Sequence, residues 1–196
     1  MALPIGISFF TFQAMSFVVD VYRGDTTASV GLARFAMFKA FFPQLVAGPI
    51  ERPGSLIPQF DTQRRLTWPV VAWGLLIVLW GVFKKVVVAD NIAPVVETVY
   101  GAPAAHMPAA LALATVLFAI QIYCDFSGYS DIARGCARIL GFRLMINFDR
   151  PYAARSFRDF WRRWHISLST WFRDYVYLPL GGRKVGIPRY IVNVGI

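Results

Sequence analysis

Apolar stretches alternate with short polar connections along the first two thirds of the chain. A helix that crosses a bilayer needs about 20 apolar residues, and three stretches reach this length, at residues 3–22, 68–88 and 107–127. Polar side chains interrupt the stretch at 3–22, so we expect one of its faces to contact other helices rather than lipid. The run IPRYIVNVGI, which starts at residue 187, is interpreted as the opening of a truncated span.

A further apolar stretch, at residues 33–48, is too short to cross a membrane. It contains Arg34 and Lys39, and it is broken by Pro43 and Gly48, because proline cannot continue a helix and Gly-Pro sequences favour turns. Such a stretch is typical of a re-entrant or interfacial segment that packs into protein.

The composition narrows the class of protein. Hydrophobic residues make up 57% of the 196 residues and charged residues 16%, against about 45–50% and 25% in soluble domains. This apolar content excludes a disordered chain, and two Cys are too few for a disulfide scaffold. We therefore predict an all-α fold, a multi-spanning integral membrane helix bundle with re-entrant or interfacial amphipathic helices, surrounded by membrane lipids.

The positive charge is concentrated in the basic region at residues 134–185. Residues 134–196 carry twelve Lys and Arg against three Asp and Glu, whereas residues 1–133 carry eight of each. The basic side chains alternate with Trp, Phe and Tyr, a pattern typical of a membrane interface or of a surface for anionic lipid or substrate. We therefore expect no nucleic-acid partner, although the net charge of +9 alone would permit one.

Residues 155–180, RSFRDFWRRWHISLSTWFRDYVYLPL, hold a histidine within this basic region. Read as one helix, their spacing places four residues on one face, namely Trp161, His165, Ser169 and Phe172. Asp159 can pair with Arg163 four residues further on. In such a helix Ser169 could orient the imidazole of His165.

Two interpretations of His165 follow from this pattern. In the first, the segment is an interfacial amphipathic helix and the imidazole is a polar group satisfied by its surroundings. In the second, His165 is a proton-transfer site: burial among Trp and Arg favours the neutral imidazole, which can accept a proton from a substrate hydroxyl.

Other polar groups have a structural interpretation beside a functional one. A cluster near the end of the stretch at 107–127 could cap a helix that breaks at Gly128; its members are Asp125, Ser127, Tyr129, Ser130 and Asp131. The sequence GPIERP at 48–53 indicates a rigid turn, or the lining of a substrate entrance. Cys124 and Cys136 are twelve residues apart, which matches no zinc pattern, so no metal site is expected.

Several strings resemble the membrane-bound O-acyltransferase family, and most closely its bacterial branch that acetylates alginate and related exopolysaccharides. The most specific is WRRWHISLSTWFRDYVYLPLGG at 161–182. It is supported by four others, which are LPIGISFFTFQAMSFVVDVYRG at 3–24, FFPQLVAGPIERP at 41–53, CDFSGYSDIARG at 124–135 and NFDRPYAARSFRDF at 147–160. The resemblance covers nearly the whole chain, so residues 1–196 are interpreted as part of one membrane domain of this family.

The resemblance implies an O-acyltransferase that moves an acetyl or other acyl group from a thioester donor to hydroxyls of an exopolysaccharide such as alginate. The donor would be acetyl-CoA or an acyl carrier, with no bound cofactor. His165 matches the first of two family histidines and is the expected catalytic residue. The second belongs to a segment beyond Ile196, which makes the chain an internal fragment; His106, in a loop, does not match it.

Further expectations accompany the resemblance. Seven residues are expected to bind substrate or line a tunnel: Trp161, Arg162, Arg163, Ser169, Asp174, Asp125 and Tyr129. Arg158 and Arg173 could join Arg162 and Arg163 in holding phosphates or carboxylates, since guanidinium suits both. The expected partners are a polysaccharide acceptor and periplasmic or membrane acetylation proteins, and the expected location is the bacterial cytoplasmic (inner) membrane, as a multi-pass protein. The alternatives are D-alanyl or acetyl transfer to teichoic acid or peptidoglycan, and a non-enzymatic transporter.

Overall fold

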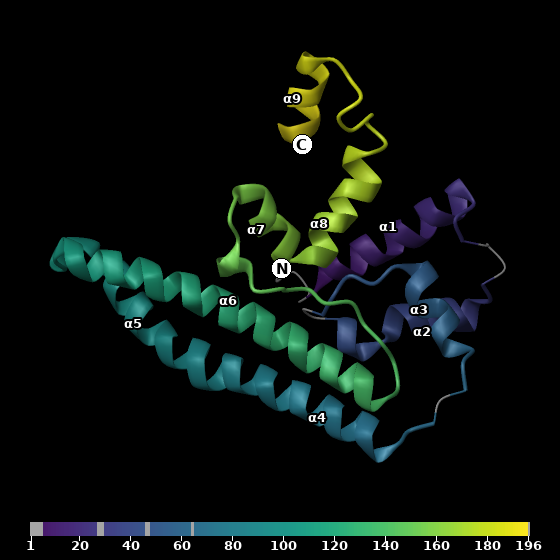
Figure 1. The fold of residues 1–196 in the computed structure, drawn as a ribbon, viewed down its shortest axis with the longest axis horizontal. Coiled ribbons are helices and arrows are strands. Elements are labelled where there is room, and N and C mark those ends of the chain that lie inside the picture. The colour runs from purple at the N-terminus through teal and green to yellow at the C-terminus, as the bar shows by residue number, and fades with distance from the viewer. Residues whose placement is uncertain (1–5, 27–29, 46–47, 64, 196) are drawn as a thin grey trace. The chain divides into compact units, whose positions relative to one another are not determined.

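The computed structural model describes residues 6–26, 30–45, 48–63 and 65–195, and every regular element in these ranges is helical (Figure 1). The α-helices are α1 (Ile7–Arg23), α2 (Leu32–Ala40), α3 (Pro53–Phe60), α4 (Trp68–Val82), α5 (Asp90–Gly101), α6 (Pro108–Ile139), α7 (Phe157–Arg163), α8 (Ile166–Phe172) and α9 (Ile187–Gly195). Shorter 3-10 turns and π-helical segments are η1 (Phe42–Gln44), η2 (Phe83–Ala89), η3 (Pro103–Ala105), η4 (Pro151–Ala153) and η5 (Arg173–Tyr177). The all-α prediction is confirmed.

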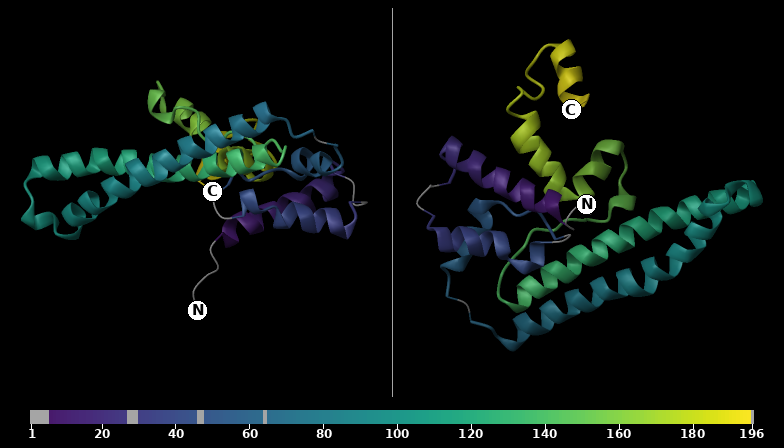
Figure 2. Two further views of the ribbon diagram at one scale, coloured as in Figure 1. Left: turned by 90° about the horizontal axis from the view of Figure 1, so that it is seen from below. Right: turned by 180° about the vertical axis from the view of Figure 1, so that it is seen from behind.

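The chain forms two compact units, one made of residues 1–62 and 145–196 and the other of residues 63–144. In the second unit α4, η2 and α5 form one continuous helical segment, Trp68–Gly101, which packs along α6 (Figures 1 and 2). Both segments are long and apolar enough to cross a membrane, with 34 and 32 residues. The apolar stretches at 68–88 and 107–127 are therefore helical, and each helix continues about twelve residues further than its stretch.

The two long segments approach each other through glycines. A Cβ atom on Gly81 would lie 2.6 Å from the carbonyl oxygen of Gly128, and one on Gly135 would lie 2.7 Å from that of Gly74. These separations leave no room for a side chain, so the two backbones are in direct contact. Small residues at contacts of this kind are typical of helices that associate within membranes.

The outer faces of these helices are apolar. Large side chains such as Leu76, Leu79, Trp80 and Val116 are more than half exposed, which soluble proteins rarely allow over an extended surface. An apolar face of this extent fits contact with lipid.

The cluster predicted to cap a helix break lies instead within the uninterrupted helix α6. The capping interpretation is wrong because Gly128 contacts Gly81 and stays helical. The neighbouring polar side chains instead bind the buried ammonium group of Lys84. Lys84 Nζ lies 2.6 Å from Asp131 Oδ2 and 3.0 Å from Ser127 Oγ. A buried ammonium group requires such partners.

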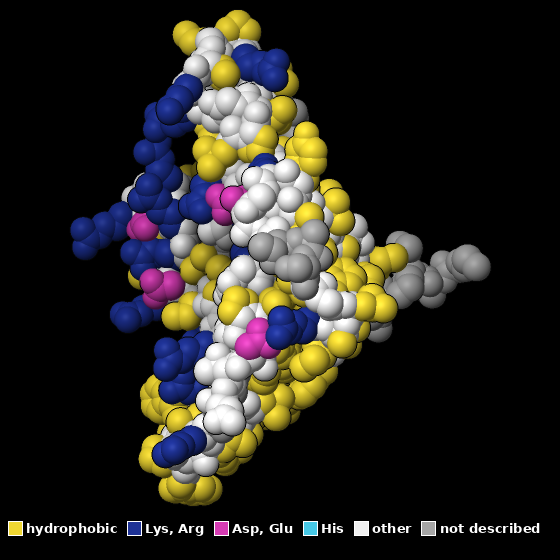
Figure 3. Space-filling view, turned by 90° about the vertical axis from the view of Figure 1, so that its right-hand side faces the viewer, with side chains coloured by type: hydrophobic (Ala, Val, Ile, Leu, Met, Phe, Trp, Pro, Cys, Tyr) yellow, Lys and Arg dark blue, Asp and Glu magenta, His cyan; other side chains and the backbone are white. Residues whose placement is uncertain are grey.

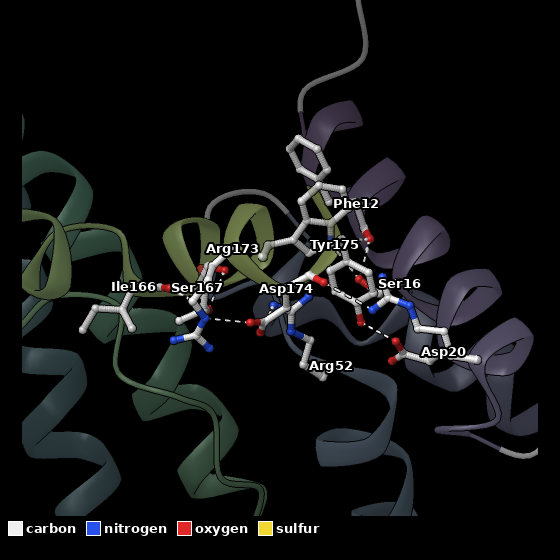
Figure 4. A network of polar contacts seen from close by, with 12 residues as sticks. Phe12, Ser16, Asp20, Arg52, Ile166, Ser167, Arg173, Asp174 and Tyr175 are labelled. Carbon is white, nitrogen blue, oxygen red and sulfur yellow. Dashed lines mark hydrogen bonds and ion pairs between the residues drawn. The ribbon is translucent and has the colours of Figure 1, made fainter. Parts of the chain in front are cut away.

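In the first unit α1 packs against α8 and η5 (Figure 4). The buried residues of α1 are Gln13, Ser16 and Asp20, so one polar face contacts protein, as its sequence predicts, whereas Ser8 and Thr11 are exposed. Residues 3–5 of the predicted span lie outside the described residues, and α1 itself has 17 residues. That α1 crosses a membrane, that residues 33–48 are re-entrant and that a span begins at 187 all stay predictions.

The glycine contacts lead to a stability prediction. Gly81→Ala places a methyl group against the carbonyl of Gly128, so we expect the free energy of unfolding to fall by about 1–3 kcal/mol, the usual cost of overpacking. Gly101→Ala, where no atom lies within 4 Å of the new Cβ, is the matched control. Denaturation followed by circular dichroism in detergent tests this, and equal stability of the two variants would contradict it.

Candidate active site

The segment that carries the histidine is not the single helix expected over residues 155–180. Helix α7 ends at Arg163, α8 begins at Ile166, and His165 between them has φ 43° and ψ 54°, in the left-handed region. This conformation is unfavourable for a residue with a Cβ. The predicted face shared by Trp161, His165, Ser169 and Phe172 is therefore split between two helices.

Hydrogen bonds from the preceding loop explain the break. The amide of Asp149 donates to the carbonyl of Arg163 at 2.9 Å, and the amide of Ile166 donates to the carbonyl of Asn147 at 2.9 Å. The two groups bonded in this way, the carbonyl of Arg163 and the amide of Ile166, lie directly before and directly after Trp164 and His165 in the chain. Tertiary pairing thus replaces the helical bonds that the sequence pattern alone would favour.

Two aromatic rings flank the partly buried imidazole of His165. The ring of Phe9, from α1, has its centroid 6.2 Å away, and the ring of Phe148 is stacked at 6.4 Å. Burial lowers the pKa of His165 from 6.5 to about 4, because desolvation disfavours the charged form. The imidazole is therefore neutral at pH 7 and can accept a proton.

The predicted pair on α7 is confirmed. Arg163 Nε donates to Asp159 Oδ1 at 3.0 Å, and the Arg163 guanidinium holds the pKa of Asp159 below its usual range. The amide of Asp159 in turn donates to Ser156 Oγ, which caps the helix. The pair lies beside an exposed neighbour, Arg162.

A cavity of about 540 Å³ lies along α8 and η5 and brings together two predicted site residues, Trp161 and Ser169. Its other lining residues are Phe172, Arg173, Val176, Tyr177 and Asn193. The hydroxyl of Ser169 donates to the carbonyl of Trp164 at 3.2 Å, so it does not orient the imidazole as expected. The walls are mainly apolar and aromatic, with a guanidinium and an amide among them.

Asp174 lies in a second, polar cavity of about 290 Å³, and Figure 4 shows it between Arg52 and Arg173. Its Oδ2 is 3.2 Å from Arg52 Nη2 and its Oδ1 is 2.7 Å from Arg173 Nε. The guanidinium carbons of Arg52 and Arg23 lie 4.4 and 5.3 Å from the ring centroid of Tyr175. Arg52, from the turn at 48–53, therefore lines a cavity, and that this cavity is a substrate entrance stays a prediction.

Glu51, the neighbour of Arg52, is buried and has a structural role. Its Oε1 accepts from the amide of Met145 at 2.6 Å and its Oε2 accepts from Ser55 Oγ at 3.2 Å. Burial raises the pKa of Glu51, and these hydrogen bonds oppose the shift. The carboxyl group ties the turn at 48–53 to the loop that leads to Asn147.

The other two predicted site residues belong to the second unit. Asp125 Oδ1 is 2.7 Å from Lys85 Nζ, and Tyr129 is exposed on α6. Their part in a passage beside His165 stays a prediction. No group of three metal-binding side chains occurs within the part of the chain that the structure describes, where Cys124 and Cys136 are free thiols.

Figure 3 shows Lys and Arg side chains on the surface next to apolar side chains. Within the first unit, the basic residues exposed to solvent are Arg23, Arg34, Arg150, Arg155, Arg158, Arg162, Arg173, Arg183, Lys184 and Arg189. Arg158 and Arg162 are one helical turn apart on α7. Such a pair can bind phosphate or carboxylate groups.

Comparison with known proteins shows the family of the chain. The membrane-bound O-acyltransferase family model matches residues 26–196. The probable alginate O-acetylase AlgI of Azotobacter vinelandii is 47% identical, over 93% of this chain and 36% of that protein. The peptidoglycan O-acetyltransferase of Helicobacter pylori is 36% identical (93% and 40%), and the teichoic acid D-alanyltransferase of Streptococcus thermophilus is 30% identical (90% and 44%). The chain thus spans less than half the length of each relative.

The lowered pKa of His165 predicts how stability depends on pH. Between pH 6.5 and about 4 the unfolded chain binds a proton that folded His165 does not, so the free energy of unfolding falls as the pH drops through this range. We expect His165→Gln to remove this loss. Urea denaturation at several pH values measures it, with His106→Gln as the control; an unchanged slope in His165→Gln would contradict the prediction.

Proposed function

The chain belongs to the membrane-bound O-acyltransferase family, and from this premise we propose that the protein transfers an acetyl or other acyl group from a thioester to hydroxyl groups of an exopolysaccharide such as alginate. The observation that carries the proposal is the neutral, partly buried imidazole of His165, held between Phe9 and Phe148. The higher identity to alginate O-acetylases favours this acceptor over teichoic acid or peptidoglycan.

The reaction balances with His165 as the proton acceptor. Its imidazole removes the proton of the acceptor hydroxyl while the oxygen attacks the thioester carbonyl, so that a C–O bond forms. The C–S bond then breaks, and the departing thiolate takes the proton from the imidazolium. A general base of this kind contributes about 10²–10⁴-fold to the rate.

The donor is proposed to be acetyl-CoA or an acyl carrier, bound as a co-substrate without a resident cofactor. Exposed guanidinium groups of Arg158 and Arg162 suit its phosphate groups. The cavity between Trp161 and Ser169 has the apolar walls and few polar groups that an acyl-thioester arm requires.

The setting of the reaction is also part of the proposal. Two long apolar helices and the family support a membrane protein, and we infer a multi-pass protein of the bacterial inner membrane, in contact with lipids. Its partners would be the polysaccharide acceptor and further acetylation proteins on the membrane or in the periplasm.

His165→Ala tests the catalytic assignment. We expect polymer acetylation to fall by about 10²–10⁴-fold, measured as acetyl groups per polymer in cells that produce the intact protein. His106→Ala, in the loop before α6, is the matched control and should acetylate normally. Near-normal acetylation by His165→Ala, at equal protein level, would rule out His165 as the base.

The double variant Arg158→Gln, Arg162→Gln tests donor binding. Losing two exposed charge-assisted contacts, each worth about 0.2–1 kcal/mol, should raise KM for the acyl donor up to roughly tenfold, with kcat nearly unchanged. Initial rates at several donor concentrations measure this. Arg189→Gln, exposed on α9, is the control, and an unchanged KM in the double variant would contradict the assignment.

A further inference from the structure

Asn147 is a polar residue that is almost fully buried in the loop beside the histidine. Its side chain is 1% exposed, and its neighbour Ser167 is 0% exposed. Asn147 Oδ1 accepts two hydrogen bonds, from the amide of Ser167 at 3.1 Å and from Ser167 Oγ at 3.0 Å. A buried amide side chain of this kind holds the groups around it in one arrangement.

The same residue also bonds through its backbone. Its carbonyl accepts from the amide of Ile166 at 2.9 Å, so Asn147 binds both residues that follow His165. On the other side, the amide of Asp149 binds the carbonyl of Arg163. Between them, the ring of Phe148 contacts Trp164 edge-on, with centroids 5.0 Å apart.

These contacts maintain a backbone that is strained. Among the described residues, the non-glycine positions in the left-handed region are His165 and Arg150, which lie on either side of this pairing. Strained backbone at a functional residue persists only where the surroundings impose it. Without the pairing, the amphipathic pattern of 155–180 favours a continuous helix, in which the imidazole would point elsewhere.

We propose that Asn147 is a positioning residue for acyl transfer, which imposes the left-handed turn at His165 and so aims the imidazole at the reacting hydroxyl. The inference rests on the proposed function, because it explains how that function's base is oriented. Asn147 touches neither substrate in this proposal and acts through His165.

Asn147→Ala removes the acceptor for both Ser167 bonds. We expect kcat for acyl transfer to fall about 10²-fold, the scale of a small misplacement of a catalytic group, while KM for the donor stays within about twofold. Ser167→Ala, which loses one of the two bonds, should fall less. Gln44→Ala, at another fully buried amide in the same unit, controls for general destabilisation and should keep its kcat.

Two further measurements separate positioning from a structural role. In a His165→Ala background, Asn147→Ala should cause no additional loss of residual transfer. In the full-length protein, His165 should react with diethyl pyrocarbonate several times faster in Asn147→Ala than in Gln44→Ala, as measured by mass spectrometry of the modified peptide.

The outcomes distinguish this inference from the function on which it rests. Normal kcat in Asn147→Ala, or a further loss in the His165→Ala background, would overturn the positioning role. If His165→Ala itself transfers acyl groups normally, the proposed base is wrong, and the pyrocarbonate rates still decide whether Asn147 holds the imidazole. If Asn147→Ala does not accumulate, Ser167→Ala supplies the same comparisons.

Discussion

The arrangement of the candidate site depends on the pairing of residues 147–149 with the chain on either side of His165. Two backbone hydrogen bonds of 2.9 Å replace the helical bonds that would otherwise join α7 to α8. The turn they impose brings together residues far apart in sequence, since Phe9 and Phe148 both flank the imidazole. Burial among these rings, and not a charged neighbour, accounts for the neutral imidazole.

Buried polar groups connect the helices on both sides of this turn. Trp171 Nε1 donates to Ser16 Oγ at 2.8 Å, and the hydroxyl of Tyr175 donates to Asp20 Oδ1 at 2.6 Å (Figure 4). The two donor residues are four residues apart in the chain, and so are the two acceptor residues. The two bonds therefore fix how α1 lies against α8 and η5. Burial, and the bond to Asp20, raise the pKa of Tyr175 to about 12, so its proton stays in this bond. In a chain this rich in apolar residues, such bonds determine which faces of the helices meet, because hydrophobic packing alone is not specific enough to do so.

The sequence pattern predicts the long helices well and their ends poorly. Residues 68–88 and 107–127 are helical, but polar side chains at 125–131 suggest an end where α6 continues to Ile139. The reason is that Asp125 and Asp131 pair with Lys85 and Lys84 of the neighbouring segment. Local sequence shows polarity, but it cannot show whether the partner of a polar group is water or another helix.

The sequence by itself determined that the protein is helical and membrane-associated, because hydrophobic periodicity and composition are local properties. It also identified His165, Trp161 and Ser169 as candidates and the pairing of Asp159 with Arg163, which lies within one helical turn. Only the tertiary structure decided that the helix breaks at His165, that Ser169 bonds to the carbonyl of Trp164, and that Asn147 and Tyr175 join separate segments through hydrogen bonds. The helix break and the contacts of Asn147 and Tyr175 depend on hydrogen bonds between residues at least 14 apart in the sequence, whose free energy outweighs the local preference for a continuous helix.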